Sequence, residues 1–535
     1  MRGSTRDLDL LQARTGALCS PPGVNRRAFL TRHAAIGAAA ILTGRVWTAE
    51  ARADRAATEA SAGKLGSTLS PDLYIVKEAK GPVLTVLEEF YKVGPGPSSS
   101  HTIGPMRITY DFYQRCERLP ADQLARATGL KVRLFGSLSA TGKGHGTERA
   151  SLAGLVGKEP ATVDPRFLDN MVAHPDQTYP VRLGDKQFVL SLTDIIYDSP
   201  KGNFPHPNTM TCQLVAGDNV VYELEYYSVG GGFIEWKGYK PPKKGQPTYP
   251  YVTMQQLRQH AEANSLSISD VILANEISVG GKSKEQIDAF LDKISNAMLA
   301  TVRSGLAAKG DVLPGPIKLH SKAATVWERA MDEQYESDRA IGLVAACALA
   351  ASEENARGHL VITAPTGGSA GVMPAIVFGL VEGKRKVSAE KIRRGLLAAA
   401  AIGYLCKHNA TLSGAEGGCQ AEVGVASAMA AAMLAETFNG SPQTVANAAE
   451  SALESHLGLT CDPVAGYVQI PCIERCAFGA VKGWSAFMIA SNEDESLHRV
   501  DLDTTIKTMA QTGRDMSSKY KETSEGGLAV NLVLC

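Results

Sequence analysis

Three stretches in the second half of the chain are apolar on almost every side. They consist largely of Ala, Leu, Ile, Met and Val and cover residues 341–351, 395–405 and 423–434. A helix on a protein surface carries a single apolar stripe, so helices that are apolar all round must be buried among other elements. The runs have charged flanks and are shorter than the roughly 18 residues of a membrane-spanning helix. We therefore expect a large all-α domain over residues 251–535.

Residues 67–250 show a different pattern. Short runs rich in β-branched and aromatic residues, at 132–135, 188–190 and 220–224, alternate with turns that contain Gly and Pro. This alternation is typical of an α+β domain. The polar, proline-bearing segment 241–247 is the expected connector. The predicted fold class is thus an α+β amino-terminal domain followed by a large all-α domain.

The composition excludes several classes of partner. The 535 residues contain 55 Lys and Arg against 55 Asp and Glu. The chain therefore has no excess of positive charge with which to bind nucleic acid or an anionic membrane surface. Hydrophobic residues make up 44%, which is enough for sizeable cores and rules out wholesale disorder. We expect no nucleic-acid partner and no stable membrane span.

Residues 1–66 differ from the rest of the chain and resemble an export signal. The twin arginines Arg26 and Arg27 precede a short apolar run at 34–44, and small residues follow at 49–53. This order of residues is typical of twin-arginine signals, and the apolar run is too short to cross a bilayer. We expect a periplasmic protein if the signal is used and a cytoplasmic one otherwise. The alternative is a disordered arm upstream of an internal start.

A run of hydroxyl residues follows the Gly- and Pro-rich turn at 94–97. The run comprises Ser98, Ser99, Ser100, His101 and Thr102. Hydroxyls and free backbone N–H groups after such a turn favour an anion-binding nest, and a histidine within it can move a proton at neutral pH. We interpret the four hydroxyl residues as substrate-binding and His101 as catalytic. The competing interpretation is a Ser-rich surface turn with a structural histidine.

A second glycine-rich loop, at residues 136–147, contains His145. It is similar to a P-loop, but five residues instead of four separate Gly136 from Gly142. Gly144 also stands where a P-loop needs Ser or Thr for magnesium. We therefore expect no nucleotide here. His145 remains a candidate catalytic residue, although a lone loop histidine is more often structural.

A third loop, at residues 363–371, separates two helical stretches. Its candidate substrate-binding residues are Gly367, Gly368, Ser369 and Gly371. Successive glycines leave backbone donors open at a helix start, where the helix dipole favours a carboxylate. A plain connection between helices is the alternative.

The ten cysteines are too sparse for a disulfide framework, and six of them follow residue 400. Three lie in segments that contain Gly or Pro, namely Cys419, Cys461 and Cys472. Pro463 and Pro471 interrupt any helix between the last two, so the three thiols can converge on bent backbone. Converging thiolates suit an iron–sulfur cluster with one iron free of a protein thiolate. A zinc site and three buried structural cysteines are the alternatives.

Taken in order along the chain, these motifs resemble the iron–sulfur L-serine dehydratases of the single-chain bacterial type. The matching segments are Ser-Ser-Ser-His-Thr-Ile-Gly-Pro-Met at 98–106, Lys-Gly-His-Gly-Thr at 143–147, Ser-Gly-Ala-Glu at 413–416, Leu-Gly-Leu-Thr-Cys-Asp-Pro at 457–463 and Pro-Cys-Ile-Glu-Arg at 471–475. Two more, at 519–524 and 526–531, precede the terminal Cys535. The resemblance runs from about residue 72 to the last residue.

The resemblance implies a cofactor, its ligands and an assembly. In this family a [4Fe-4S] cluster is held by three cysteines that match Cys419, Cys461 and Cys472. A terminal cysteine, here Cys535, caps the fourth iron until substrate displaces it. Family members are homodimers, and their amino-terminal domain resembles an allosteric substrate-binding module. Their reaction belongs to amino-acid degradation and gluconeogenesis.

The resemblance also implies an L-serine ammonia-lyase that forms pyruvate and ammonia through aminoacrylate. An open iron acting as a Lewis acid would take the hydroxyl oxygen of L-serine, and a base would remove the α-proton. We expect His101 to be that base, with His145 as the second candidate. The loops at 98–102 and 367–371 would hold the substrate carboxylate.

Some positions depart from the family pattern. Gly367 stands where Asn is usual, Ser455 where His is usual and Cys476 where Asn is common. These departures leave the cluster ligands untouched but bear on substrate preference, so another β-hydroxy amino acid such as threonine is an alternative substrate. Two other classes of protein also stay open. One is an iron–sulfur redox or sensor protein, and the other is an amino-acid-binding homologue without catalysis.

Overall fold

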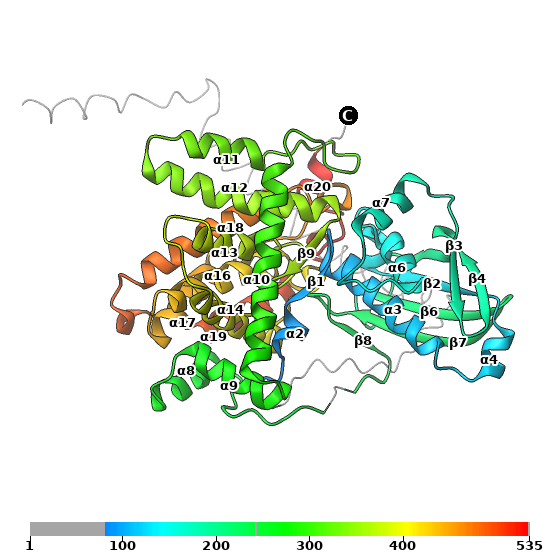
Figure 1. The fold of residues 1–535 in the computed structure, drawn as a ribbon, viewed down its shortest axis with the longest axis horizontal. Coiled ribbons are helices and arrows are strands. Elements are labelled where there is room, and N and C mark those ends of the chain that lie inside the picture. Colours follow the sequence, from blue (N-terminus) through cyan, green and yellow to red (C-terminus); the bar gives the residue numbers. More distant parts are fainter. Residues whose placement is uncertain (1–80, 241–242, 533–535) are drawn as a thin grey trace, which may run out of the picture. The chain divides into compact units, whose positions relative to one another are not determined.

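The computed structural model describes residues 81–240 and 243–532 (Figure 1). These residues form an α/β region followed by an all-helical region, which confirms the predicted fold class. The expected export signal at 1–66 and the terminal Cys535 lie outside the described residues. Among the helices that are described, none is long and apolar enough to cross a membrane.

A five-stranded sheet is the main sheet of the α/β region (Figure 1). Its strands in spatial order are β5 (Ile195–Ser199), β2 (Gly129–Phe135), β6 (Thr209–Ala216), β7 (Asn219–Ser228) and β8 (Ile234–Trp236). β2 and β5 are parallel, and the other neighbours are antiparallel. A separate hairpin pairs β3 (Tyr179–Leu183) with β4 (Lys186–Leu190). The runs expected to be strands at 132–135, 188–190 and 220–224 fall in β2, β4 and β7.

Two packed helices follow the loops that contain the candidate histidines. These are α3 (Gly104–Cys116), which begins just after His101, and α6 (Thr147–Leu155), which begins just after His145. Gly154 allows their close approach, because a β-carbon there would lie 2.4 Å from the carbonyl oxygen of Met106. The shorter helices of this region are α2 (Leu87–Phe90), α4 (Ala121–Arg126), α5 (Ser137–Thr141) and α7 (Pro165–Ala173).

A short two-stranded sheet joins distant parts of the chain. β1 (Lys92–Pro95) pairs antiparallel with β9 (Leu360–Thr363). Asn355 adds a second link, because its Nδ2 donates to the carbonyl oxygens of Pro97 at 2.7 Å and Gly367 at 2.9 Å. The strand pair and this amide hold the hydroxyl run and the glycine loop against each other.

The helical region is built around α16 (Val423–Thr437), in which every residue is buried. The helices α13 (Val372–Val381), α14 (Ala389–Asn409), α17 (Pro442–Glu454) and α18 (Cys472–Ala490) pack on it. The apolar runs at 395–405 and 423–434 are buried throughout, as predicted. The run at 341–351 is fully buried only from Ala346 onward, because the first turns of α12 (Glu336–Arg357) face solvent.

The remaining helices surround this group or connect it. They are α8 (Met254–Ala263), α9 (Ile268–Gly280), α10 (Lys284–Ala307), α11 (Ala323–Asp332), α15 (Gly414–Gly417), α19 (Leu502–Asp515) and α20 (Leu528–Asn531). Between β8 and α8 the described residues form neither helix nor strand. The domain boundary at 241–247 stays a prediction.

One buried carboxyl group sits inside the helical core. Glu276 of α9 accepts hydrogen bonds from the Tyr404 hydroxyl at 2.8 Å and from the backbone N–H of Leu87 at 3.1 Å. Burial, which disfavours the charged form, raises the pKa of Glu276 to about 7. The folded protein therefore holds a proton on this group at pH values where the unfolded chain has lost it.

We expect Gly154→Ala to disturb the site through its scaffold. The added methyl group meets backbone atoms of α3 and must push α3 and α6 apart, at a cost of about 1–3 kcal/mol in the free energy of unfolding. Chemical denaturation measures this loss. Gly379→Ala on α13 is the matched control, since no heavy atom lies within 4 Å of its added β-carbon. Equal stability of the two variants would contradict the tight contact.

We also expect Glu276→Gln to remove a pH dependence of stability. As pH rises from the ordinary carboxyl pKa through about 7, the wild type loses up to roughly 3 kcal/mol, because its folded state must release the proton from a buried site. The amide keeps an oxygen for Leu87 and Tyr404 and has no charged form. The variant should match the wild type near pH 5 and exceed it near pH 8 in urea unfolding. Parallel pH profiles would count against a raised pKa.

Candidate active site

The hydroxyl run is buried and folded into a tight helical turn. Ser98, Ser99, Ser100, His101 and Thr102 are each less than 5% exposed. The Ser98 side chain caps the turn by accepting from the backbone N–H of His101 at 3.1 Å. The alternative of a Ser-rich surface turn is therefore wrong.

The structure brings the two candidate histidines together. The ring centroids of His101 and His145 are 4.5 Å apart, and both side chains are fully buried. Two crossed hydrogen bonds fix their loops, because Thr102 Oγ1 donates to the His145 carbonyl at 2.7 Å and Thr147 Oγ1 donates to the His101 carbonyl at 2.6 Å. This pairing depends on the α3–α6 contact, because each helix begins at one of these loops.

His145 has one ring nitrogen without a hydrogen-bond partner. Its Nδ1 donates to the carbonyl oxygen of Thr141 at 2.9 Å, which places the proton on Nδ1 and the lone pair on Nε2. Among the described residues, the buried Nε2 has no hydrogen-bond partner, and the carboxylate oxygen Glu522 Oε1 lies 3.8 Å from it. Burial lowers the pKa of His145 to about 4, so the ring is neutral at ordinary pH.

Both ring nitrogens of His101, in contrast, are engaged. Ser137 Oγ donates to the Glu522 carbonyl at 3.0 Å and therefore accepts from His101 Nε2, also at 3.0 Å. Nδ1 then accepts from Ser100 Oγ at 2.9 Å. Burial holds the pKa of His101 well below its usual value, and a positive charge on His145 would lower it further. His101 is thus neutral and tied into a hydrogen-bonded chain.

Glu522 comes from the last described segment of the chain. Its carboxylate oxygen Oε1 lies 3.4 Å from both His101 Nδ1 and Ser100 Oγ, and Oε2 has no partner among the described residues. Burial and the nearby Cys419 thiol raise the pKa of Glu522. Its backbone has φ of +60°, a left-handed conformation that is unusual for a residue other than Gly and often marks a functional site.

Only two of the four residues that the sequence predicts to bind substrate in the glycine loop lie beside the hydroxyl run or Glu422. A β-carbon on Gly367 would lie 2.7 Å from the backbone nitrogen of Ser99, and one on Gly368 would lie 3.0 Å from the Glu422 carboxylate. Gly367 therefore lies beside the hydroxyl run, and Gly368 lies beside Glu422. Ser369 instead forms a hydrogen bond with Thr366 within the loop at 3.0 Å, and Gly371 packs against α12.

Four backbone donors are left over where these two loops meet. Within residues 81–240 and 243–532, no acceptor bonds to the N–H groups of Ser99, Ser100, Gly367 and Gly368. Unpaired backbone donors at the start of a helical turn form a cradle for an anion. The two loops together have the donors for a carboxylate group.

A metal-binding constellation lies next to this cradle. The ligand atoms of Cys419, Glu422 and Cys461 all lie within 4.8 Å of one another, and all three residues are buried. Gly414 leaves room for them, because a β-carbon there would lie 2.6 Å from Glu422 Oε2 and 3.3 Å from Cys461 Sγ. Two thiols and a carboxylate are donors suited to a transition metal. All eight cysteines in the described part of the chain are free thiols.

Cys472, the first residue of α18, does not belong to this group of three, but its thiol interacts electrostatically with Cys419 and Glu422. Burial raises the pKa of the Cys472 thiol. The pKa of the Cys461 thiol is also raised, first by a hydrogen bond with Cys419 and then by burial. Arg475 counteracts this effect on Cys472 with its positive charge, while its guanidinium donates to Asp462 at 3.2 Å. Metal binding must remove the thiol protons, and Arg475 favours the resulting thiolates.

Five residues of this site were not predicted from the sequence. They are Ser137, Asn355, Glu422, Arg475 and Glu522. Glu422 has the clearest signal, because it is a carboxylate three residues after Cys419 and just before a buried apolar helix. Glu522 lies in the 519–524 segment, which matches the family pattern but does not by itself indicate a role for Glu522.

Known families account for both regions of the chain. The family model for the serine dehydratase beta chain matches residues 86–239, and that for the serine dehydratase alpha chain matches residues 263–529. The chain belongs to the serine dehydratase family. The family resemblance seen in the sequence is thereby confirmed.

Curated relatives of this serine dehydratase match over nearly their whole length. L-serine dehydratase 2 of Escherichia coli is 41% identical over 459 residues, which cover 84% of this chain and 99% of that protein. L-serine dehydratase of Haemophilus influenzae is 40% identical over 454 residues, covering 83% and 98%. L-serine dehydratase of Streptomyces coelicolor is 41% identical over 455 residues, covering 84% and 99%.

Replacing the converging thiols should remove the metal. We expect Cys419→Ala and Cys461→Ala to lose most of the metal bound per chain, because each change deletes a ligand atom of the buried group. Elemental analysis of the purified protein measures this. Cys347→Ala, which removes an equally buried thiol from the core of α12, should keep the wild-type content. Unchanged metal in both ligand variants would rule out this group as the binding site.

Proposed function

We propose that this serine dehydratase converts L-serine to pyruvate and ammonia by eliminating water through aminoacrylate. The observation that carries the proposal is the proximity of three buried elements, which Glu522 and Glu422 connect. These are an unpartnered imidazole nitrogen on His145, an anion cradle and the converging thiols. Elimination requires a base for the α-proton, a hold on the carboxylate and help for a poor leaving group.

We propose a [4Fe-4S] cluster as the cofactor, with Cys419, Cys461 and Cys472 as its ligands. When bound, such a cluster supplies Lewis acidity toward the departing hydroxyl group. The donor set fits, because all three thiols are buried and free, those of Cys419 and Cys461 lie close together, and the nearby His145 and Glu522 each have an unpartnered polar atom among the described residues. Glu422 would then lie beside the cluster as a further oxygen donor or as a contact to substrate.

The cradle would orient the substrate. The N–H groups of Ser99, Ser100, Gly367 and Gly368 would bind the carboxylate of L-serine and so direct its Cα toward the histidine pair. Because the lining residues are almost fully buried, substrate binding expels water from the site. The low polarity that results strengthens each of these hydrogen bonds.

His145 is the better candidate for the base, with His101 in a positioning role. The lone pair on His145 Nε2 is free, and the Nδ1 bond to Thr141 fixes the tautomer. The sequence favoured His101, but both of its nitrogens are engaged by serine hydroxyls. Proton removal from Cα by His145 would leave an imidazolium 3.8 Å from the Glu522 carboxyl oxygen, and this positive charge would favour the ionised form of that carboxyl group.

The chain end adds one further element to the proposal. The backbone N–H of Leu528 donates to Asp462 at 2.7 Å, and Ser524 Oγ donates to the Pro463 carbonyl at 2.7 Å. Both bonds anchor the chain next to Cys461, at positions seven and eleven residues before Cys535. We keep Cys535 as the proposed cap of the fourth iron. The homodimer and the export signal stay predictions.

Purified chain tests the reaction directly. We expect anaerobically prepared protein to contain about four irons per cluster-bearing chain and to release pyruvate from L-serine, with D-serine as the inactive control. L-threonine in a parallel assay distinguishes the neighbouring β-hydroxy substrate. A protein with a reversible redox signal but no pyruvate, or one that binds L-serine without turnover, would place the chain in the redox or binding class instead.

The assignment of the base is tested by a matched trio of variants. We expect His145→Gln to lower kcat by roughly 100- to 10,000-fold at unchanged metal content, because it removes the proton acceptor. His456→Gln is the control, since His456 is also buried and also bonds to the carbonyl four residues earlier, at 2.7 Å. His101→Gln should cost less than His145→Gln. If His101→Gln proves the more damaging change, the roles of the two histidines are reversed.

A further inference from the structure

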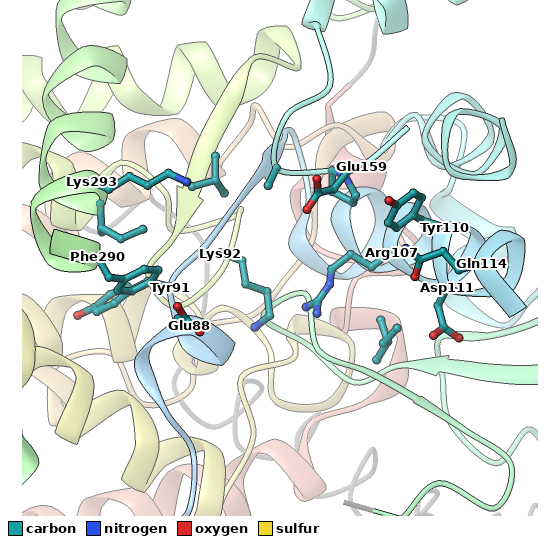
Figure 2. Close-up of a pocket in the computed structure, with 15 residues that line it drawn as sticks. Glu88, Tyr91, Lys92, Arg107, Tyr110, Asp111, Gln114, Glu159, Phe290 and Lys293 are labelled. Atoms are coloured by element: carbon teal, nitrogen blue, oxygen red, sulfur yellow. The ribbon is translucent and has the colours of Figure 1, made fainter. Parts of the chain in front are cut away.

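A cavity lies apart from the histidines and thiols. Its volume is about 410 Å³, within the range of small-molecule sites. Figure 2 shows its lining residues, which come from α2, β1, α3, β8 and α10 and from the loop after α6. None of the residues placed in the active site lines it.

Three cations surround this cavity without an acidic partner. In Figure 2 the ends of Lys92 and Arg107 approach one another, and Lys293 extends toward the same space from α10. Lys92 is 7% exposed, and its Nζ donates only to backbone carbonyls, including that of Gly231 at 3.1 Å. Arg107 Nη1 donates to the carbonyl of Gly232 at 2.6 Å. Among the described residues, none of the three cations forms an ion pair.

The acidic residues of the lining are already compensated or exposed. Asp111 accepts from Arg115 at 2.6 Å and from the Tyr226 hydroxyl at 2.6 Å. Glu88 is exposed and pairs with Lys282, and Glu159 is also exposed. The buried end of the cavity therefore keeps an excess of positive charge.

Burial disfavours the charged forms of Lys92 and Arg107. It lowers the pKa of Lys92 well below its usual value, and the nearby charges of Arg107 and Lys407 lower it further, whereas Glu89 acts in the opposite direction. Burial also lowers the pKa of Arg107, against the nearby charges of Glu89 and Asp111. Buried charges are normally paired, so a cavity with two such cations that form no ion pair among the described residues is suited to an anionic ligand.

We propose that this cavity binds a small molecule that carries a phosphate group. Arg107 would bind the phosphate oxygens through its fork of donors, with Lys92 and Lys293 as further contacts. A phosphate group with close to two negative charges matches several cations, whereas a single carboxylate leaves most of them unpaired. Tyr91, Phe290 and Ile294 form an apolar wall for the organic part.

Calorimetric titration of the full chain tests this proposal, with inorganic phosphate and glycerol 3-phosphate as probes at constant ionic strength. Acetate is the monoanion control. We expect saturable binding of at least one phosphate probe and none of acetate. Arg107→Gln should weaken binding roughly tenfold or more, and Lys293→Gln, on an exposed residue that folding does not need, should weaken it severalfold.

Two controls separate this site from other anion sites. Lys384→Gln, which removes an exposed lysine paired with Glu336, should leave the affinity unchanged. Phosphate binding should also persist in Cys461→Ala, whose change lies at the metal centre. Absence of saturable binding, wild-type affinity in both Arg107→Gln and Lys293→Gln, or loss of binding with Cys461→Ala would each overturn the proposal.

Discussion

Two backbone hydrogen bonds between Cys461 and the end of the chain hold the site together. The N–H of Cys461 donates to the Tyr520 carbonyl at 2.8 Å, and the N–H of Glu522 donates to the Cys461 carbonyl at 2.8 Å. These two hydrogen bonds tie Cys461, which has a thiol, to Glu522, which has a carboxyl group. The carboxylate in turn faces His101 and His145, which belong to the α/β region. Residues from three distant parts of the sequence therefore meet at a single point.

The buried character of this point explains its chemistry. Histidines in water titrate near neutral pH, but here the loss of hydration keeps both rings neutral. The same loss raises the pKa values of Glu422 and Glu522, which increases their tendency to hold protons. A site that disfavours charge on its own residues is prepared for a bound group or substrate that brings charge with it. The unpartnered atoms on His145 and Glu522 fit this account.

Much of the fold could be predicted from local sequence patterns, because a buried segment must consist of apolar residues on each side that packs against a neighbour. The runs at 395–405 and 423–434 are apolar all round and are buried all round. The run at 341–351 shows the limit of this reasoning, since Ile341 is apolar and yet 56% exposed. Whether such a residue is covered depends on which neighbours its helix has, and a local pattern does not contain that information.

The candidate site divides in the same way. His101 and His145 could be selected because Gly and hydroxyl residues surround them, but their 4.5 Å separation depends on the contact of α3 and α6 at Gly154. Glu522 could not be selected, since no pattern in the neighbouring sequence distinguishes a functional acidic residue in a polar tail from a solvent-exposed one. The choice between the two histidines needed individual hydrogen bonds, which only the folded chain defines.

The position of Glu522 also sets an order in time. A chain is synthesised from its amino terminus, so residues 520–522 leave the ribosome after the other described residues of the site have been made. Until then Cys461 lacks its backbone partners, and the histidine pair lacks its carboxylate. A nascent chain, or one truncated before residue 520, lacks these contacts and therefore has an incomplete site. Completion of the site therefore requires that the chain has been synthesised at least through Glu522.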